Sequence, residues 1–546
     1  MNNASIVLKG IIFDSTGKNP FHGAIAIKDN YILEVGNEEM IKPYIRSSTQ
    51  ILDYKDKLIL PGFNDSHTHI SSGSFYTDPH FGCDLSECRS LDEVLKKIKI
   101  FADEHIDNEW IFGYFANNML WQDTQLPTNK DIDKIINNKP VMIQLFDLHT
   151  IIVNSQAMKK VGITQDTPQP YDGINEKDEN GELTGRFFDG ACLPFNHSLY
   201  DVSDEVYMNV YSNFFHKMKC LGITTVGLLE PFGVTKDPLP FFKKMVEENI
   251  LTTRVMAYPY ITTYNKESYQ KLTSKYNTNF LQVKGYKQLV DGVTSVFTAH
   301  LLEPYRNNPH TCGSYSVDIN ELRQQVLNAY KEGISVRLHA IGDRTVREVL
   351  DIFEEAQTKY GKKDIRNVIE HLETVHPDDM KRFKELNVSC GMQPWHMLIV
   401  LQSGDLGNGL YGDKENAVGK ERAQHSWPFK ELWDNQAIIS LGSDYPVVGI
   451  EPMKEIYAAV TRQRFDGEPK GGWMPHQKLT ISQALQAYTK NSAFVEGIDN
   501  IVGTLEKGKL ADIIILDKNL FEIEPKEILT TNVVMTMVDG KIIYKK

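Results

Sequence analysis

The feature that most constrains the fold is an alternation of short strand-like runs with helical patterns. Eight apolar runs typical of buried strands occur in order, at 58–60 and onward, 224–226, 254–257, 283–290, 335–339, 367–371, 388–392 and 438–441. Strands that alternate with helices form parallel sheets, because a helical crossover returns the chain to the same end of the sheet. Eight such units are the number in a (β/α)₈ barrel, so this α/β fold class is predicted.

Both ends of the chain lack this alternation and show short strand patterns joined by turns. The pair Asp539 and Gly540, for example, is a hairpin turn signal between two apolar runs. We predict one small β domain built from residues 1–56 and 497–546, beside a barrel of residues 57–496. The interval from about 73 to 200 is too long for one strand–helix connection, and we interpret it as an inserted cap subdomain.

Charge and hydropathy exclude several classes of partner. The 59 Lys and Arg residues are outnumbered by 72 Asp and Glu residues, and the formal net charge of -13 disfavours non-specific binding to nucleic acid. No apolar stretch reaches the ~20 residues of a membrane span, and the start of the chain lacks the pattern of a signal peptide. The six cysteines are scattered and form no disulfide framework. We expect a cytoplasmic protein that binds neither nucleic acid nor membrane.

A His-x-His pair follows the first predicted barrel strand. His67 and His69 are two residues apart, so on a strand both side chains point to the same face. At the carboxyl end of a barrel strand, that face borders the position of barrel active sites. Two converging imidazoles suit a divalent metal. Such pairs also occur by chance on exposed strands, and this alternative stays open for the pair alone.

Three more side chains that can bind a metal or transfer a proton end other predicted strands. They are His339, His371 and Asp444, each directly after an apolar run. Any one of them alone is more simply explained as a surface or hydrogen-bonded residue. Four strands that place such groups on one rim favour a metal centre at the carboxyl ends of the strands.

Lys287 lies inside the strand-like run at 283–290, just before Asp291 and Gly292. A lysine that points into a barrel is costly unless it is neutral or paired. Lys287 is therefore either an outward, solvated lysine or an inward one with a lowered pKa. In the second case, its neutral amine can be carboxylated to a carbamate that bridges two metals.

These residues and several longer motifs resemble the amidohydrolase superfamily. The Pro-Gly-Phe triplet at 61–63, followed by His67 and His69, is similar to the start of that superfamily. Further motifs resemble its family 3 branch, which includes N-substituted formamide deformylase. They lie at 339–344, 392–396, 442–447 and 503–512, and in the insertion at 126–133 and 149–155.

The resemblance implies a barrel flanked by a small β-sandwich made from both termini. It also implies one or two divalent metals, most simply zinc, with Lys287 as the carboxylated bridge and Asp444 as both ligand and proton shuttle. The other implied ligands are His67, His69, His339 and His371. The chain departs from the family at Gly227 and Leu228, where a His-Asp pair is common, and at Asp189, where Glu is usual.

The function expected from these features is metal-dependent hydrolysis of a non-peptide C–N (amide) bond in a small molecule. A metal would lower the pKa of water from about 15.7 to about 7, and Asp444 would deliver a proton to the leaving nitrogen. We expect substrate contacts from His149, Trp121 and His396. For His149 a structural hydrogen bond, and for Trp121 ordinary core packing, are the alternatives.

Two other functions are weighed against this one. A deaminase of the same superfamily usually carries a Glu shortly after the fifth-strand histidine, whereas residues 340–343 here are Ala-Ile-Gly-Asp. That difference and Lys287 favour amide hydrolysis. A non-catalytic regulator on the same fold would typically lack ligands, and all the expected ones are present. The pattern leaves the substrate and a homo-oligomer open.

Overall fold

The computed structural model describes residues 3–118, 121, 126–146, 148–170, 173–229, 235–263, 265–403 and 414–546. The chain divides into two compact units. The first comprises Met1–Thr68, Phe215–Glu230 and Met245–Lys546, and the second comprises His69–Phe214 and Pro231–Lys244.

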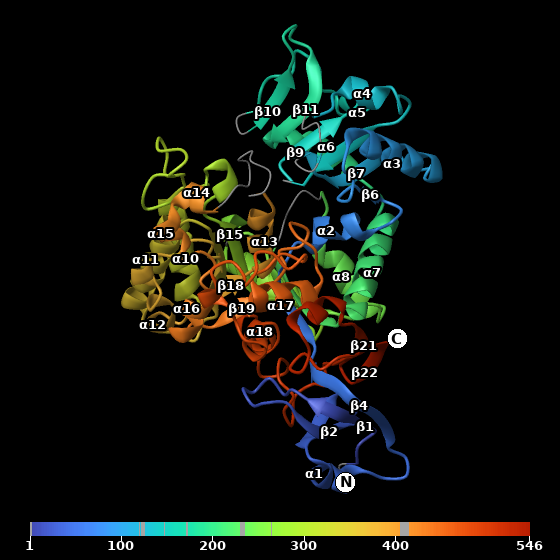
Figure 1. The fold of residues 1–546 in the computed structure, drawn as a ribbon, viewed down its shortest axis with the longest axis vertical. Coiled ribbons are helices and arrows are strands. Elements are labelled where there is room, and N and C mark those ends of the chain that lie inside the picture. The colour runs from blue at the N-terminus through green and yellow to red at the C-terminus, as the bar shows by residue number, and fades with distance from the viewer. Residues whose placement is uncertain are drawn as a thin grey trace. The chain divides into compact units, whose positions relative to one another are not determined.

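A seven-stranded sheet in the first unit takes strands from both ends of the chain, and Figure 1 shows its blue and red strands together. Its order is β22-β21-β20-β4-β1-β2-β3, and only the β1–β4 pair is parallel. Along β1, Val7 and Leu8 point into different hydrophobic clusters, as the period of two requires. The strands are β1 (Ile6–Ile12), β2 (Phe21–Lys28), β3 (Tyr31–Gly36), β4 (Gln50–Pro61), β20 (Ile513–Leu516), β21 (Val533–Val538) and β22 (Lys541–Lys545).

Two parallel sheets form the centre of the first unit. One has the order β14-β13-β12-β5, with β5 (Phe63–Thr68), β12 (Ile223–Leu229), β13 (Arg254–Tyr258) and β14 (Leu281–Val283). The other runs in chain order through β15 (Gly285–Leu289), β16 (Ser335–Ala340), β17 (Asn367–His371), β18 (Val388–Met392) and β19 (Ile439–Leu441). Two single parallel bridges connect the two sheets. Thr68 at the end of β5 pairs with Tyr445 after β19, and Lys287 on β15 pairs with Tyr260 after β13.

The strand predictions need two corrections. The run at 58–60 belongs to β4 in the seven-stranded sheet, where Leu58 pairs with Ile11, and the first strand of the parallel set is β5. The chain passes from one sheet to the other at Gly62, where a Cβ atom would lie 2.2 Å from the Thr224 hydroxyl. The run at 283–290 is two strands, β14 and β15. The other six predicted runs are strands in the structure.

Helices follow most of the parallel strands and have recognisable end signals. In α10 (Ile319–Lys331) the N-cap Asp318 accepts hydrogen bonds from the first-turn amides, and α11 (Asp343–Tyr360) ends at Gly361. The other helices that lie in, or partly in, this unit are α1 (Glu38–Ile41), α7 (Asp204–Cys220), α8 (Leu239–Glu247), α9 (Lys266–Lys275), α12 (Arg382–Glu385), α13 (Pro394–Ser403), α14 (Lys414–Val418), α15 (Lys420–Ala423), α16 (Phe429–Asp434), α17 (Pro452–Thr461), α18 (Ile481–Ala487) and α19 (Lys490–Val495).

The second unit has its own six-stranded mixed sheet, in the order β10-β11-β9-β8-β7-β6. Its strands are β6 (Gly82–Asp84), β7 (Ile111–Ala116), β8 (Val141–Leu145), β9 (Thr150–Val153), β10 (Gly173–Lys177) and β11 (Leu183–Asp189). Its remaining helices are α2 (Ile70–Thr77), α3 (Leu91–Glu104), α4 (Asn129–Asp133), α5 (Ser155–Val161) and α6 (Leu193–Tyr200).

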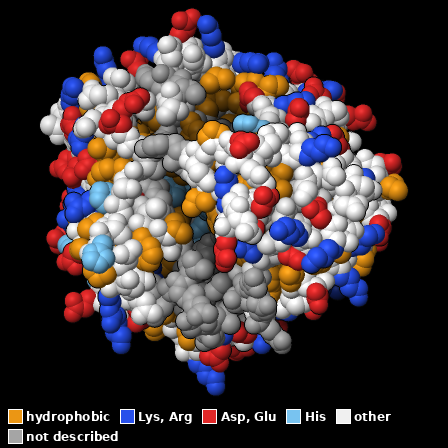
Figure 2. All heavy atoms as spheres, turned by 90° about the horizontal axis from the view of Figure 1, so that it is seen from above, with side chains coloured by type: hydrophobic (Ala, Val, Ile, Leu, Met, Phe, Trp, Pro, Cys, Tyr) orange, Lys and Arg blue, Asp and Glu red, His pale blue; other side chains and the backbone are white. Residues whose placement is uncertain are grey.

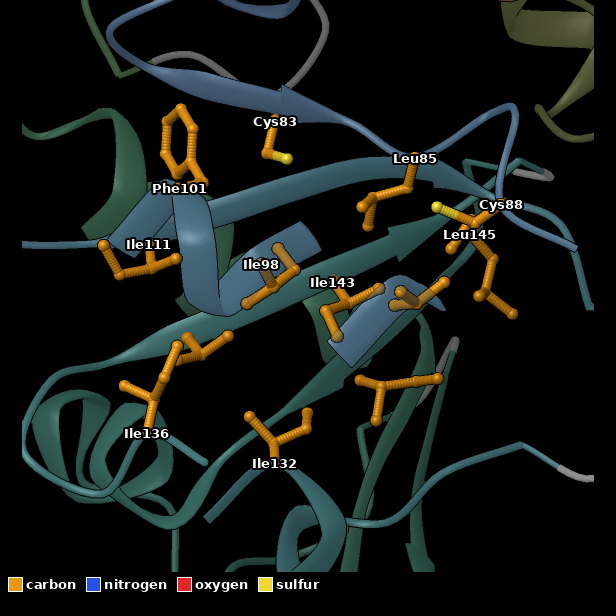
Figure 3. Close-up of a cluster of buried hydrophobic side chains, with 14 of the residues drawn as sticks. Cys83, Leu85, Cys88, Ile98, Phe101, Ile111, Ile132, Ile136, Ile143 and Leu145 are labelled. Carbon is orange, nitrogen blue, oxygen red and sulfur yellow. The ribbon is translucent and has the colours of Figure 1, made fainter. Parts of the chain in front are cut away.

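The core of the second unit forms where α3 packs on this sheet. Val94, Ile98 and Phe101 of α3 recur with helical spacing and are buried in one cluster with Ile111 and Ile143 of β7 and β8 (Figure 3). The unit therefore has a hydrophobic core of its own. Among the helices that the structure describes, none is long and apolar enough to cross a membrane.

Candidate metal centre

The sequence-predicted ligands come from the carboxyl ends of the parallel strands. Each of these residues is at most 7% exposed. Lys287 lies on β15, His339 on β16 and His371 at the end of β17, whereas Asp444 follows β19. On the other sheet, His67 lies on β5 and His69 directly follows that strand.

Two groups of imidazoles lie around Asp444. The ligand atoms of His67, His69 and Asp444 lie within 4.8 Å of one another, and so do those of His371, His396 and Asp444. The Oδ1 atom of Asp444 is 3.2 Å from His67 Nε2, whereas its Oδ2 atom is 3.6 Å from His396 Nε2 and 3.9 Å from His371 Nδ1. Metal–ligand bonds of ~2.0–2.1 Å set donor atoms roughly 3–3.5 Å apart, so these separations are close to those of shared ligands.

The chemistry of this donor set fits a divalent metal. Imidazole nitrogens and a carboxylate oxygen are the ligands that zinc and related ions take in proteins. The Nδ1 atom of His371 and the Nζ atom of Lys287 are buried and have no hydrogen-bond partner among the residues that the structure describes. A buried polar atom without a partner is costly, and coordination to an ion would remove that cost at His371.

His67 is oriented by a buried carboxylate that the sequence analysis did not identify. Glu370 Oε2 lies 2.8 Å from His67 Nδ1, and Glu370 Oε1 accepts a hydrogen bond of 2.6 Å from Arg337 Nε. Burial opposes ionisation of Glu370, but Arg337 and His67 outweigh it and hold its pKa well below the usual value. An ionised Glu370 accepts the proton of His67 Nδ1, and in a neutral ring of this tautomer the Nε2 lone pair is available to a metal ion beside Asp444.

Gly391 makes room for this carboxylate. It is paired with Glu370 across β17 and β18, and a Cβ atom at position 391 would lie 2.0 Å from Glu370 Oε2. The backbone is also unusual at the centre, because His371, Leu372 and Asp444 have φ values of 77°, 52° and 58°. Non-glycine residues at such φ values cost about 1–3 kcal/mol each and cluster at functional sites. Strand alternation would separate Glu370 from His371, and the left-handed turn at His371 breaks that alternation.

Asp444 is tied to β5 through the backbone and through Asp65. The amide of Asp444 donates to His67 O at 2.7 Å, and Asp65 Oδ1 accepts from the Ser443 amide at 2.9 Å. Asp65 Oδ2 accepts from the Tyr488 hydroxyl, and burial raises the pKa of Asp65 to about 6. The turn that carries Asp444 is therefore fixed against the strand that carries His67.

Lys287 is an inward lysine. Only 1% of the residue is exposed, and burial lowers its pKa to about 8 although Glu370 and Asp444 act in the opposite direction. The solvated alternative considered from the sequence is therefore wrong. An amine in this environment is neutral in a substantial fraction of molecules at pH 8.

His339 is buried but belongs to neither of the two compact groups. Its Nε2 atom lies 3.4 Å from Gly292 O and 3.6 Å from Asp291 Oδ1. Asp291 in turn accepts three backbone hydrogen bonds, from His300, Ile341 and Gly342. This nitrogen of His339 thus faces the loop after β15.

Of the predicted substrate contacts in the second unit, His149 is exposed and Trp121 is not. His149 Nδ1 lies 2.8 Å from Asp189 Oδ1, and 61% and 58% of the two side chains are exposed. The φ of Asp189, 51°, is again left-handed. Trp121 is 5% exposed within the core cluster of this unit, a position that favours packing over substrate contact.

Arg337 and Glu370 had a signal in the sequence. Both are charged residues in the middle of runs that otherwise have the pattern of buried strands. A buried charge needs a partner, so two such residues on neighbouring strands indicate a pair. Gln393, whose Nε2 atom lies 3.2 Å from His67 Nδ1, had no comparable signal.

Comparison with known proteins places this chain in a family. The model of the amidohydrolase family matches residues 50–544. The chain is 29% identical to the protein LONG AFTER FAR-RED 3 of Arabidopsis thaliana over 99% of this chain and 91% of that protein. It is 24% identical to N-substituted formamide deformylase of Arthrobacter pascens, over 97% of this chain and 96% of that enzyme.

A solved structure agrees with this result. An uncharacterized metal-dependent hydrolase from Pyrococcus horikoshii OT3 superposes with a TM-score of 0.77 at 25% sequence identity, and the match covers 95% of this chain and 99% of that one. The fold is therefore the mixed α/β type of the metal-dependent hydrolases. The chain belongs to the amidohydrolase family and is a hydrolase of carbon–nitrogen bonds.

Proposed function

We propose that this protein hydrolyses an amide bond in a small molecule with the help of a divalent metal. The proposal rests on one observation, the convergence of His67, His371 and His396 around the Asp444 carboxylate. The similarity to N-substituted formamide deformylase supports an amide as the bond that is broken.

His67, His69 and Asp444 would hold the metal, together with His371 and, as the family resemblance implies, His339 and Lys287. Nitrogen and oxygen donors make zinc the simplest ion, as one or two atoms. When bound, the metal supplies Lewis acidity that makes water more acidic and polarises a carbonyl group.

Asp444 would move the proton. An amide anion is a very poor leaving group, so the departing nitrogen must be protonated. A carboxylate at this position can take a proton from the attacking water and give it to that nitrogen, and such help contributes ~10²–10⁴-fold. The hydrogen bonds from the Asp444 amide to His67 and from Ser443 to Asp65 fix this carboxylate in place.

We also propose that Lys287 is carboxylated when two metals are bound. Its buried Nζ atom has no hydrogen-bond partner in the part of the chain that the structure describes, and a positive charge there would repel metals. The neutral amine would add to carbon dioxide, and one proton would leave as the carbamate forms.

The domain organisation predicted from the sequence supports this function. We propose that the two parallel sheets belong to one (β/α)₈ barrel, expected from the sequence at 57–496 and beginning in the structure with β5, and that the two ends of the chain form a β-sandwich. The isolated bridges Thr68–Tyr445 and Tyr260–Lys287 support closure. We further propose that the inserted cap, about 73–200, controls specificity, with His149 as a substrate contact.

The expected partners follow from charge. Acidic and basic side chains are interspersed over the face in Figure 2, and the formal net charge is -13, so we propose a small-molecule substrate and neither nucleic acid nor membrane as a partner. A homo-oligomer and a cytoplasmic location remain compatible with this proposal.

A substrate screen tests the proposed function. Metal-reconstituted protein would be assayed against N-substituted formamides, N-acyl amino acids and cyclic amides, with ammonia release from aminated heterocycles as the test for a deaminase. We expect amide hydrolysis that a chelator abolishes and added metal restores. Less than about a tenth of an equivalent of transition metal, with no gain on metal addition, would overturn the proposal, because such sites normally retain their ion.

A further inference from the structure

We propose that Lys414 is a positioning residue that, through Glu373, fixes the turn carrying His371. The inference rests on the proposed function, because the turn borders the metal centre, and it leaves the ligand set that the family resemblance implies unchanged. Lys414 is assigned no contact with the metal or the substrate, and its role is to hold other residues in place.

Lys414, the first residue of α14, is buried and paired. Only 1% of its side chain is exposed, and its Nζ atom lies 3.0 Å from Glu373 Oε2. The same ammonium group donates to Thr294 Oγ1 at 2.8 Å and lies 5.0 Å from the centre of the Trp427 ring. A buried lysine is rare and is costly unless it is paired, so these contacts define one position for its ammonium group.

The Glu373 carboxylate joins three segments that are far apart in the sequence. Its Oε2 atom accepts hydrogen bonds from Lys414 Nζ and, at 3.2 Å, from Thr294 Oγ1. Thr294 lies in the loop after β15, the strand of Lys287, whereas Glu373 lies just after β17, the strand that ends at His371. Lys414 therefore links the segments that follow two strands with predicted ligands.

The turn after β17 has a backbone conformation that its surroundings must hold. His371 and Leu372 have φ values of 77° and 52°, which are unfavourable for residues with a side chain. The Leu372 amide donates to the carbonyl group of the last residue of β16, and the Trp427 amide donates to Glu373 O at 3.2 Å. With the bond from Lys414, both the backbone and the side chain of Glu373 are fixed. The direction of the His371 imidazole depends on this turn.

Removing the charge of Lys414 would release the turn. Only 12% of the Glu373 side chain is exposed, so its carboxylate would stay largely buried without a cation, which is unfavourable. The carboxylate would move toward water, and the backbone two residues after His371 would move with it. Loss of a group that orients a ligand weakens metal binding about 10–100-fold, and we expect the lower end because Lys414 acts through Glu373.

A Co²⁺ titration of the metal-free, full-length protein tests the inference, because the visible absorption of Co²⁺ depends on the geometry of its ligands. In Lys414→Met we expect a changed spectrum, about 10-fold weaker binding and a lower midpoint of urea unfolding. In the double variant Lys414→Met/Glu373→Leu no unpaired charge stays buried, so the urea midpoint should recover. Its spectrum and Co²⁺ affinity should stay altered, because the turn still lacks its link to Thr294 and α14.

Lys430→Met is the matched control. Lys430 pairs with Asp434 in the same unit, but 35% of its side chain is exposed, so its loss should leave the spectrum and the Co²⁺ affinity unchanged. If Lys414→Met does not fold, the double variant and this control carry the comparison.

Two results would overturn the inference. One is an unchanged spectrum in Lys414→Met together with a Co²⁺ affinity within about twofold of the unaltered protein. The other is a double variant in which spectrum, affinity and urea midpoint all recover, because the pair would then only stabilise the fold. Chelator-sensitive hydrolysis by the unaltered protein is measured separately, so either result leaves the proposed function standing if that activity is found.

Discussion

Replacing Glu370 with Gln tests how His67 is positioned. The side chain keeps its volume but loses its charge and one acceptor, and both acceptors are in use, one toward His67 Nδ1 and one toward Arg337 Nε. If the amide oxygen faces Arg337, the amide nitrogen faces His67 and moves the ring proton to Nε2, which then cannot bind a metal. If the oxygen faces His67, two donors meet at Arg337, which is fully buried.

The two orientations have costs that can be measured separately. Loss of a carboxylate that orients a histidine ligand weakens metal binding ~10–100-fold, or about 1.4–2.7 kcal/mol. Breaking a buried ion pair lowers the free energy of unfolding by about 3–5 kcal/mol. In Glu370→Gln we therefore expect weaker metal binding if the amide nitrogen faces His67, a lower free energy of unfolding if it faces Arg337, and a part of each loss if both orientations are populated. Competition with a chromophoric chelator measures the metal affinity, and urea unfolding of the metal-free protein measures stability.

The matched control is Glu355→Gln on α11. Glu355 also pairs with an arginine, Arg323, at 2.5 Å, but 40% of its side chain is exposed. A solvent-exposed pair of this kind is worth about 0–1 kcal/mol, and metal affinity should not change. If Glu370→Gln binds metal within twofold of the unaltered protein and unfolds with the same free energy, Glu370 does not position His67.

Three other changes give distinct outcomes. Burial raises the pKa of Glu496 to about 8, so the free energy of unfolding of the wild type falls as the pH rises from about 4.5 through 8. In urea unfolding, Glu496→Gln should be more stable than the wild type by on the order of 1–3 kcal/mol at pH 9 and by little at pH 4. An equal effect of the substitution at both pH values would contradict this prediction. Arg254 is fully buried and donates two hydrogen bonds to the Asp512 carboxylate, at 2.7 and 3.0 Å, so Asp512→Asn should lower the free energy of unfolding by about 3–5 kcal/mol. Lys99→Ala, which breaks the exposed Lys99–Asp103 pair, should lower it by only about 0.5 kcal/mol. Asp189→Gly should raise the melting midpoint, because glycine relieves left-handed strain of about 1–3 kcal/mol, and it should lower the turnover of true substrates. Asp189→Asn is the control that keeps the strain. A lower melting midpoint in Asp189→Gly would refute the idea that the backbone strain at this residue serves the function.

Much of the fold was predictable because it depends on local patterns. Runs such as 335–339 and 367–371 are apolar, short and flanked by helical patterns, and each is a strand in the structure. The error at residues 58–60 has a physical cause. The same apolar run is the end of β4 and leads through Gly62 into β5, so the sequence shows one continuous signal where the chain changes sheets.

The candidate site was predictable only where spacing or strand position determines it. His67 and His69 follow from a period of two, and His371 and Asp444 from strand ends. The Glu370–His67 contact joins residues 303 apart, and it needs both the neighbouring Arg337 and the absence of a side chain at Gly391. No local pattern specifies those three conditions together.

His339 and His396 show why the direction of an imidazole needs the structure. In the sequence, His339 and His396 are both histidines near the carboxyl end of a predicted strand, and the family resemblance selects the first. The direction of each imidazole depends on the segment that comes after its strand. After β16 the chain is held by two hydrogen bonds to Asp291, from the amides of Ile341 and Gly342, and His339 Nε2 faces the loop that carries Asp291. After β18 a helix begins within two residues and turns His396 toward Asp444. Which nitrogen of each imidazole faces Asp444 and which faces a neighbouring loop therefore depends on the segment after the strand, and the spacing of residues in the sequence does not specify it.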